Sequence, residues 1–382
     1  MLKKYLIAPG PTPVPEKVLL EMTKPVIHHR TSEFSATFEK VANGLKKVFS
    51  TEQDVLMLAG SGTAAMEAAV VNTLNPGDNV LVINAGKFGQ RWRDICKTYG
   101  ILVSTIDMDW GKAAKPEEIE QFLKANPDTK AVLLQGSETS TTVYHPVEEI
   151  AKVVRKNENT LLIVDGITSI GVHDTKFDEW GIDIAITGSQ KAFMLPPGLS
   201  LICLSKKAWN FVEKSTIPRY YLDLRKELKS QKQATTAYTP ALTLINGLAV
   251  VLEMFEEEGL ENVYKRHAVN GEATRAAVKA MGFKLLAETP SNAATGFYLP
   301  EDIDGGKLVK FMREKVGITY AGGQDHLKGR IVRISHLGYH DAFDTITAIS
   351  GLEMGLRKFG VDIKLGSGIA AAEEILQNYI GE

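Results

Sequence analysis

The chain has few cysteines, almost no net charge and no long apolar run, and each shortage argues against a class of protein. Its two cysteines, Cys96 and Cys203, form no CxxC pair and have no histidine cluster beside them. A disulfide framework and a metal site are therefore both unsupported. The formal net charge is −2 and no dense Lys/Arg block occurs, so we expect no nucleic-acid partner.

No stretch approaches the ~20 apolar residues that span a bilayer. Near the start of the chain, the apolar run before Pro9 is too short for the core of a signal peptide. We therefore expect no membrane partner and a cytoplasmic protein, which the low cysteine usage also fits.

The chain nevertheless has enough apolar residues to form a core. Of the 382 residues, 44% are hydrophobic and 24% charged, which is ordinary for a globular chain, and the length indicates two domains.

Between about residues 54 and 205, short apolar runs alternate with helical patterns, as in proteins with a parallel sheet. The apolar runs cover residues 54–59, 80–84, 102–107, 131–135, 161–165, 182–187 and 199–204. The helical patterns include residues 63–74, 87–99, 116–125 and 146–156. Because crossovers between parallel strands are right-handed, we expect an α/β fold whose mostly parallel sheet is sandwiched by helices.

After Pro240 the pattern changes to longer helices mixed with strands. Helical stretches cover about 240–258, 261–281, 305–316, 341–358 and 367–379, and strand-like pieces cover 283–287, 295–299 and 331–335. This mixture is typical of a smaller α+β domain. At the other end, residues 1–15 are rich in proline and should be extended. We therefore divide the chain into an N-terminal extended segment (1–20), a large domain (21–256) and a small C-terminal domain (257–382).

The segment Gly60-Ser-Gly-Thr63 follows an apolar run and opens a helical pattern. Its small residues let the backbone approach a ligand, and the first-turn N–H groups of a helix attract a phosphate. A plain strand-to-helix turn is the alternative. The segment also matches a dinucleotide fingerprint, which needs an acid at the end of the next strand. That strand ends in Asn84, so an NAD-linked oxidoreductase is disfavoured.

Two further residues lie where ligands bind open α/β sheets, at the carboxyl ends of strands. Asp165 ends an apolar run, and a carboxylate buried there would be unstable unless it paired with a cation. Lys191 follows the next run and precedes the rigid turn Pro196-Pro-Gly198. A lysine at this edge can form a Schiff base with an aldehyde. Taken singly, Asp165 could start a turn and Lys191 could be a surface charge; their order along one sheet favours the functional interpretation.

Together these segments resemble the class V aminotransferases of the fold-type I pyridoxal-phosphate family, in particular the alanine–glyoxylate and serine–pyruvate group. The resemblance covers nearly the whole chain and implies the aspartate-aminotransferase-like fold. The segments that carry it are Pro9–Pro13, Gly60–Thr63, Ser137–Thr141, Val164–Asp165, Gly188–Lys191, Pro196–Gly198, Thr236–Pro240 and Val332–Ser335. The ordered set of the acid, Ser-Gln-Lys and Pro-Pro-Gly is its most specific part.

The resemblance also implies a role for each matching residue. Lys191 would hold pyridoxal phosphate as an internal aldimine, Asp165 would pair with its pyridine nitrogen, and Arg333 would grip the substrate carboxylate. The other implied positions are Ser61, Gly62, Thr63 and Gln190 at the phosphate, Phe88 stacked on the ring, Thr139 at the ring oxygen, Ile167 beside the ring, Gly10 beside the substrate, and Thr236 and Thr239 reaching the phosphate of a neighbouring subunit. The last pair implies a homodimer with shared active sites, and no position implies a metal.

Two positions depart from some relatives, which have His in place of Thr63 and Trp in place of Phe88. Phe88 could instead be a core aromatic residue, and Thr139 could be a loop cap. A strand arginine such as Arg333 would be costly to bury without an anion.

The implied reaction is transamination between a small amino acid, alanine or serine, and glyoxylate or pyruvate. An aspartate donor stays open if Arg30 or His29 reads its second carboxylate. A lyase, epimerase or phosphonate transaminase with the same cofactor also stays open, as does a non-catalytic module with this fold. A cysteine desulfurase is disfavoured, because no cysteine follows Cys203 and Gln190 stands where those enzymes typically have His.

Overall fold

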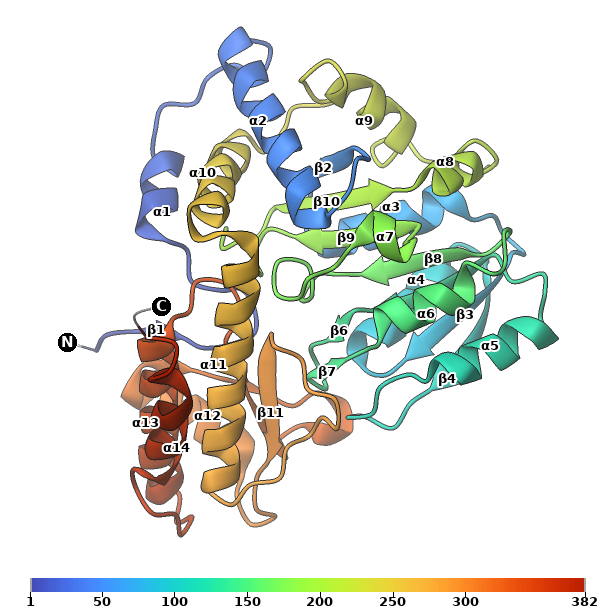
Figure 1. The fold of residues 1–382 in the computed structure, drawn as a ribbon. Helices are drawn as coiled ribbons and strands as arrows, with labels where there is room; N and C mark the ends of the chain where they lie inside the picture. Colours follow the sequence, from blue (N-terminus) through green and yellow to red (C-terminus); the bar gives the residue numbers. More distant parts are fainter. Residues whose placement is uncertain (1, 381–382) are drawn as a thin grey trace.

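A seven-stranded sheet forms the centre of the computed structural model, which describes residues 2–380 (Figure 1). Its strand order is β2-β10-β9-β8-β5-β3-β4, and all neighbours are parallel except β10, which is antiparallel to both β2 and β9. The strands are β2 (Val55–Ala59), β3 (Asn79–Asn84), β4 (Leu102–Asp107), β5 (Ala131–Gln135), β8 (Leu161–Asp165), β9 (Ile184–Gly188) and β10 (Leu199–Leu204). The expected mostly parallel sheet is confirmed.

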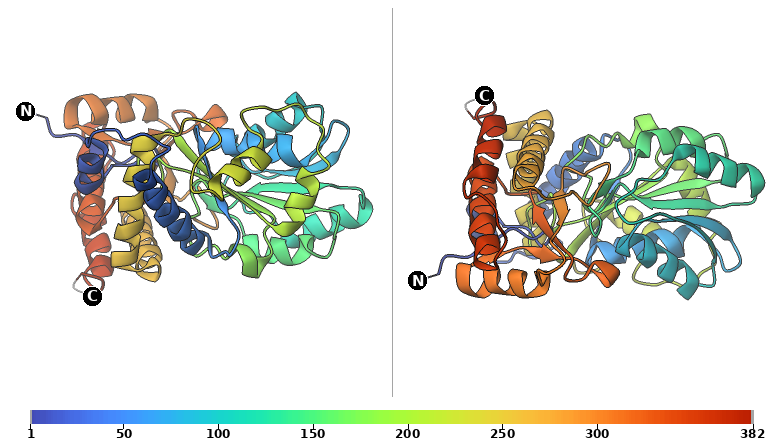
Figure 2. Two further views of the ribbon diagram at one scale, coloured as in Figure 1. Left: turned by 90° about the horizontal axis from the view of Figure 1, so that it is seen from above. Right: turned by 90° about the horizontal axis from the view of Figure 1, so that it is seen from below.

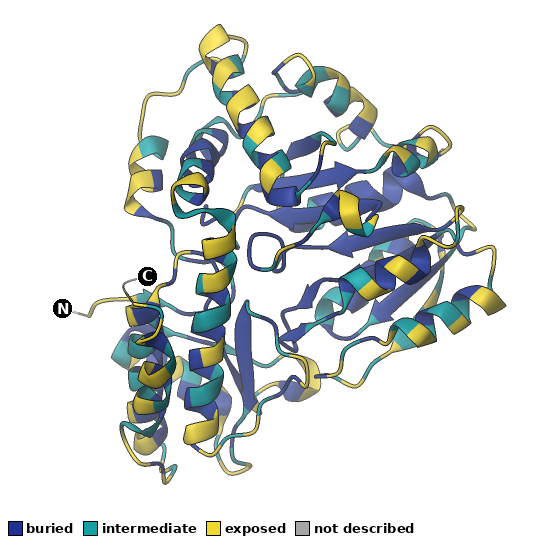
Figure 3. Ribbon diagram, viewed as in Figure 1, coloured by how far each residue is buried: buried dark blue, intermediate teal, exposed yellow. Residues whose placement is uncertain are grey.

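Alternate residues of each strand enter two apolar clusters, one on each face of the sheet. In β8, Leu161 and Ile163 pack on the face covered by helices α3 and α4, whereas Leu162 and Val164 face the opposite layer. Figure 2 shows helices on both sides of the sheet, and Figure 3 shows its strands largely buried, except for the edge strand β4. The helices are α2 (Ser32–Phe49), α3 (Gly62–Thr73), α4 (Lys87–Thr98), α5 (Pro116–Ala125), α6 (Val147–Val154), α7 (Phe177–Trp180), α8 (Lys206–Val212) and α9 (Leu224–Gln231).

The N-terminal segment is extended only as far as Pro15, so the expectation of an extended segment to residue 20 was wrong at its end. Helix α1 (Glu16–Met22) begins directly after Pro15, because a proline is tolerated just before the first helical turn. No proline occurs within the helix itself. Helix α1 packs against α10 (Leu242–Glu258). Before it, β1 (Tyr5–Leu6) pairs in parallel with β12 (Ile318–Thr319), which ties the start of the chain to its C-terminal part.

The C-terminal part has its own apolar core around a three-stranded antiparallel sheet, in the order β11-β14-β13. The strand expected at residues 283–287 is absent as a strand; an isolated bridge joins Leu285 to Phe297 there. The elements of this part are α11 (Leu260–Ala280), β11 (Ala294–Tyr298), α12 (Gly305–Phe311), a π-helical turn (Met312–Val316), β13 (Ala321–Gly322), a 3₁₀ turn (Asp325–Leu327), β14 (Ile331–Ser335), α13 (Ala342–Lys358) and α14 (Ser367–Leu376).

The described residues include no helix that is both long and apolar enough to cross a membrane.

Two buried histidines serve as hydrogen-bond acceptors, one where the two parts meet and one within the C-terminal part. His173, in the loop after β8, stacks on Tyr144 with ring centroids 4.0 Å apart, and its Nε2 accepts from the backbone N–H of Asn292 at 3.2 Å. His267 of α11 accepts likewise from the backbone N–H of Gly338 at 2.9 Å. A ring nitrogen that accepts must be unprotonated. Burial, assisted by the charge of the nearby Arg275, lowers the pKa of His173 to about 3.

We predict that acid destabilises the protein through these rings. Because the folded pKa of His173 lies below the ordinary value of 6.5, its contribution is full above pH 6.5 and is lost as pH falls toward about 3, since the unfolded chain binds the proton first. Each such ring contributes a slope of about 1.4 kcal/mol per pH unit in this window. Measured by denaturant unfolding at several pH values, His173→Gln should lower the slope, whereas the exposed-site variant His28→Gln should not. Equal slopes in all three proteins would contradict this.

Candidate active site at the carboxyl edge of the sheet

The parallel strands β3, β5, β8 and β9 end at one edge of the sheet, and their following loops meet there. Gln135 ends β5 and pairs in register with Asp165, the last residue of β8. The alternation of each strand places both residues on the face that α3 and α4 cover. The loop Ser189–Lys191 follows β9 at the same edge. The predicted acid and amine therefore arrive at one place from neighbouring strands.

The Lys191 side chain is held by the N-terminal segment. Its Nζ donates a hydrogen bond to the carbonyl of Pro9, and the hydroxyl of Thr12 donates to the carbonyl of Lys191 at 2.9 Å. A Cβ on Gly10, whose φ is +123°, would lie 1.9 Å from Lys191 Nζ. Desolvation lowers the pKa of Lys191 to about 8, and the charge of Arg333 acts in the same direction, whereas Asp165 opposes it.

Asp165 is 3% exposed, and its Oδ1 accepts from the backbone N–H of Ile167 at 2.9 Å. Burial raises the pKa of Asp165 to about 7; the Ile167 hydrogen bond and the positive charges of Arg91 and Lys191 hold it down. A cation placed against this carboxyl would stabilise its ionised form. A protonated pyridine nitrogen is such a cation.

The start of α3 forms a cradle with unused polar groups. The N-cap Ser61 makes no side-chain capping bond, and Gln190 Oε1 is buried without a hydrogen-bond partner. The backbone is close-packed here. A Cβ on Gly62 would lie 2.4 Å from Ile167 Cδ1, and one on Gly188 would lie 3.0 Å from Gln190 Oε1. Unsatisfied N–H and O–H donors at a helix N-terminus fit a phosphate group, and the amide of Gln190 would contribute through its NH₂ group.

Two side chains of α4 line the same region. The Arg91 guanidinium lies over the Phe88 ring at 4.9 Å from its centroid, and its Nη1 donates to the Thr63 hydroxyl at 3.2 Å. Arg91 therefore joins the expected stacking residue to the cradle. The sequence motifs did not single it out, although it lies one helical turn after Phe88.

Arg333 of β14 reaches across from the C-terminal part to the large domain. It is 7% exposed; its Nε and Nη2 donate to the Gly322 carbonyl at 3.0 and 2.9 Å, and its Nη1 donates to the Thr139 carbonyl at 2.7 Å. Burial lowers the pKa of Arg333 to about 10, while the charge of Glu138 raises it. The Thr139 hydroxyl shares a hydrogen bond with that of Thr168 at 2.7 Å.

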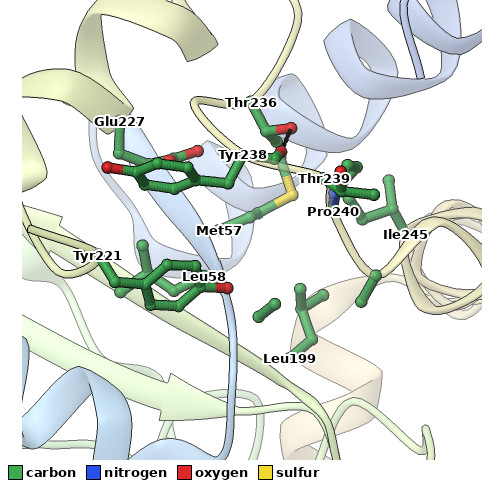
Figure 4. Close-up of a pocket in the computed structure, with 12 residues that line it drawn as sticks. Met57, Leu58, Leu199, Tyr221, Glu227, Thr236, Tyr238, Thr239, Pro240 and Ile245 are labelled. Carbon is green, nitrogen blue, oxygen red and sulfur yellow. Dashed lines mark hydrogen bonds between the residues drawn. The ribbon is translucent and has the colours of Figure 1, made fainter.

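Thr236 and Thr239 lie in a different pocket, beside β2 and β10 (Figure 4). The Thr236 hydroxyl donates to the Tyr238 carbonyl at 2.6 Å. Among residues 2–380, no hydrogen bond links either threonine to Lys191 or Asp165. Within one chain the structure thus does not bring these two residues to the other predicted site residues, and their reach into a second subunit stays a prediction.

Glu138 is the most important residue of the site that the sequence motifs did not assign. This fully buried carboxylate accepts hydrogen bonds from the backbone of Phe88 and Gly89 and from Ser140. It lies in the Ser137–Thr141 segment that carries the family resemblance, but nothing local in the sequence identifies its partners on α4. Over the part of the chain that is described, no group of three or more His, Cys, Asp or Glu side chains is arranged to hold a metal ion.

Comparison with known proteins identifies relatives of the whole chain. The family model described as "Aminotransferase class-V" matches residues 4–348. A "soluble hydrogenase, small subunit" of Synechococcus sp. is 41% identical over 98% of both chains. A serine–glyoxylate aminotransferase of Methylorubrum extorquens is 38% identical over 98% of this chain and 96% of its own length. An L-aspartate–glyoxylate aminotransferase of Paracoccus denitrificans is 37% identical over 97% and 95%.

Among solved structures, ureidoglycine–glyoxylate aminotransferase from Bacillus subtilis superposes with a TM-score of 0.94 at 29% identity, covering 99% of both chains. The fold expected from the sequence is therefore confirmed over the whole chain.

We predict that Gly10→Ala impairs attachment of an aldehyde to Lys191, because the added Cβ overlaps Nζ. The absorbance of a Schiff base formed with pyridoxal phosphate should fall at least 10-fold at a fixed subsaturating concentration. Gly77→Ala is the matched control: Gly77 also has a positive φ, +87°, but nothing lies within 4 Å of an added Cβ. The control should lose about 1–2 kcal/mol of stability from its strained backbone and keep the absorbance. Full attachment in Gly10→Ala would refute the close approach.

Proposed function

The chain belongs to the aminotransferase class-V family and is an aminotransferase, and on this premise we propose that it uses pyridoxal phosphate held on Lys191 to transfer an amino group from a small monocarboxylate amino acid to glyoxylate. The observation that carries the proposal is the meeting of three desolvated charged groups. The Arg333 guanidinium lowers the pKa of the Lys191 amine and the Asp165 carboxyl raises it, while Lys191 in turn lowers the pKa of Asp165. Asp165 and the loop that carries Lys191 follow the neighbouring strands β8 and β9. Perturbed pKa values of this kind cluster at catalytic sites.

The residues present fit the cofactor. Ser61, Thr63, Gln190 and the first-turn amides of α3 would hold its phosphate, and the ionised Asp165 would keep a proton on its ring nitrogen. Phe88, anchored through its backbone N–H, would cover one face of the ring. When bound, pyridoxal phosphate supplies an aldehyde for Schiff-base formation and a ring that withdraws electrons from the substrate Cα.

Lys191 is suited to act as a general base. Its pKa of about 8 leaves an appreciable neutral fraction at neutral pH, so its free amine would be able to accept a proton from the Cα of a bound substrate. The Pro9 carbonyl holds Nζ in place through a hydrogen bond. Arg333, whose planar fork suits a carboxylate, would orient the substrate at the same spot.

Glyoxylate is the acceptor named for the serine–glyoxylate, L-aspartate–glyoxylate and ureidoglycine–glyoxylate relatives, and we adopt it over pyruvate for this reason. Serine or alanine is the favoured donor, because one buried guanidinium suffices to read a single carboxylate. A cysteine desulfurase finds no support, since Cys96 and Cys203 are both buried and burial raises the pKa of the Cys96 thiol to about 12.

We predict that Lys191→Ala abolishes covalent attachment of pyridoxal phosphate and lowers transamination by at least 10³-fold, because it removes both the Schiff-base amine and the general base. Borohydride reduction followed by peptide mass spectrometry measures attachment; a donor panel with glyoxylate measures turnover. Lys97→Ala, at an exposed lysine of α4, is the control and should match the wild type. Attachment to any other lysine in the wild type would refute the assignment.

We further propose a homodimer in which Thr236 and Thr239 reach the partner's phosphate. Large apolar side chains are exposed on the N-terminal segment and near the Thr236 loop: Leu19, Leu20, Val26, Tyr220 and Tyr221. A second copy of the chain would cover them.

An aspartate donor is a second candidate, favoured by one contact. Arg30 Nη1 donates to the Thr235 hydroxyl at 2.9 Å, and that hydroxyl donates to the carbonyl of His29 at 3.4 Å. If the Thr236 loop enters the partner's site, then Arg30 goes with it. Arg30 would then supply the second cation that a dicarboxylate donor needs. The L-aspartate–glyoxylate relative has such a donor in its name.

We predict that Arg30→Gln lowers kcat/KM for aspartate about 10-fold or more while leaving that for serine within 2-fold, because only aspartate has a second carboxylate. Lys24→Gln, at an exposed cation of the same segment, serves as the control. If kcat/KM falls equally for serine and aspartate, Arg30 holds the loop rather than the substrate.

Light scattering of the wild type tests the proposed homodimer independently.

A further inference from the structure

Glu138 caps a helix to which it is not adjacent in sequence. Its Oε2 accepts from the backbone N–H groups of Phe88 at 3.0 Å and Gly89 at 3.1 Å, which belong to the first turn of α4. The residue at the N-cap position, Gly86, has no side chain to do this. A Cβ on Gly86 would lie 2.6 Å from the Glu138 carboxyl carbon, so the glycine makes room for the incoming carboxylate.

The other oxygen of Glu138 fixes its own turn. Oε1 accepts from the Ser140 backbone N–H at 3.1 Å and from the Ser140 hydroxyl at 2.5 Å. Burial raises the pKa of Glu138, while all of these donors lower it. Each of its hydrogen-bond partners donates, and the N-terminus of α4 adds a favourable dipole, so the ionised form suits the site.

The residue between Glu138 and Ser140 supports the substrate-binding side. The Thr139 carbonyl accepts from Arg333 Nη1 at 2.7 Å, and its hydroxyl is paired with Thr168. One short turn thus connects the backbone of Phe88, through the carboxylate of Glu138, to the guanidinium of Arg333. The two groups come from α4 and from β14 of the C-terminal part, and no direct hydrogen bond joins them within residues 2–380.

We propose that Glu138 is a positioning residue that holds Phe88 and Arg333 in fixed relation, so that the cofactor ring and the substrate carboxylate are bound in one geometry. The proposal rests on the proposed function, which assigns a ring to Phe88 and a carboxylate to Arg333. Both carboxylate oxygens of Glu138 are occupied by hydrogen bonds from the protein itself. Its two oxygens act on different sides of the site. Oε2 supports the cofactor side through α4, and Oε1 supports the substrate side through the turn that carries Thr139.

This difference between the two oxygens makes Glu138→Gln an informative variant. An amide oxygen can replace Oε2 and keep the cap on α4, but the amide NH₂ then faces the Ser140 N–H, where donor meets donor. The expected result is a split. Affinity of the apo-protein for pyridoxal phosphate should stay within 3-fold of the wild type, whereas binding of propionate, a monocarboxylate without an amino group, should weaken at least 5-fold. Glu138→Ala should weaken both at least 10-fold.

Glu353 offers a matched control for mere structural damage. It is 2% exposed, and its two oxygens accept from the backbone N–H groups of Gly366 and Gly368, both at 2.7 Å, at the start of α14. Glu353→Ala removes a buried capping carboxylate outside the site. It should lower the melting temperature as Glu138→Ala does, without changing either dissociation constant.

A double-mutant cycle tests whether Glu138 acts through Phe88. In a Phe88→Leu background, Glu138→Ala should change the affinity for pyridoxal phosphate less than 2-fold, because the ring that it positions is gone. The proposal is overturned if the effects of the two substitutions multiply, or if Glu138→Gln binds both ligands like the wild type. Failure of the proposed function is separate and would appear as a wild type that attaches no pyridoxal phosphate at Lys191.

Discussion

Desolvation of charge at the carboxyl edge of the sheet is the constraint on which the site depends. Lys191, Asp165 and Arg333 are each removed from water, and each therefore departs from its ordinary pKa. An amine with a pKa of about 8 keeps an appreciable neutral fraction near neutral pH, whereas a carboxyl with a pKa of about 7 becomes fully ionised there only when a cation is placed against it. The same residues on a surface would be ordinary charges without this chemistry.

The architecture brings these groups together by joining separate parts of the chain. Parallel strands end at one edge, which delivers Asp165 and Lys191 side by side with the N-terminus of α3. The N-terminal segment then crosses to hold Lys191 through Pro9, and β14 of the C-terminal part reaches back with Arg333. Because the site is shared between these parts, contacts that join them, such as the hydrogen bond from the Asn292 N–H to His173, help to set its geometry.

Local sequence patterns predicted much of the fold. The apolar runs at 131–135, 161–165 and 199–204 coincide with β5, β8 and β10, because continuous apolar stretches between turns are typical of strands buried on both faces. The run at 102–107 also coincides with a strand, β4, which lies at the edge of the sheet and is partly exposed. The antiparallel direction of β10 was not predicted, since a strand's composition does not depend on the direction of its neighbours. The strand expected at 283–287 did not form, because its residues make a single β-bridge, to Phe297, and no continuous ladder of strand hydrogen bonds.

For the site, the sequence by itself determined which residues have the right chemistry and at which strand ends they lie: the acid at 165, the amine at 191, and the glycine-rich start of α3. Only the tertiary structure decided which groups surround them. Glu138 acts on backbone N–H groups about fifty residues earlier in the chain, and Arg333 donates to the carbonyl of Thr139 from the C-terminal part of the chain. Every residue except proline has a backbone N–H, and every residue has a carbonyl, so no residue type marks these partners in advance. Only folding removes particular N–H and carbonyl groups from water and brings them within hydrogen-bond distance of Glu138 and Arg333.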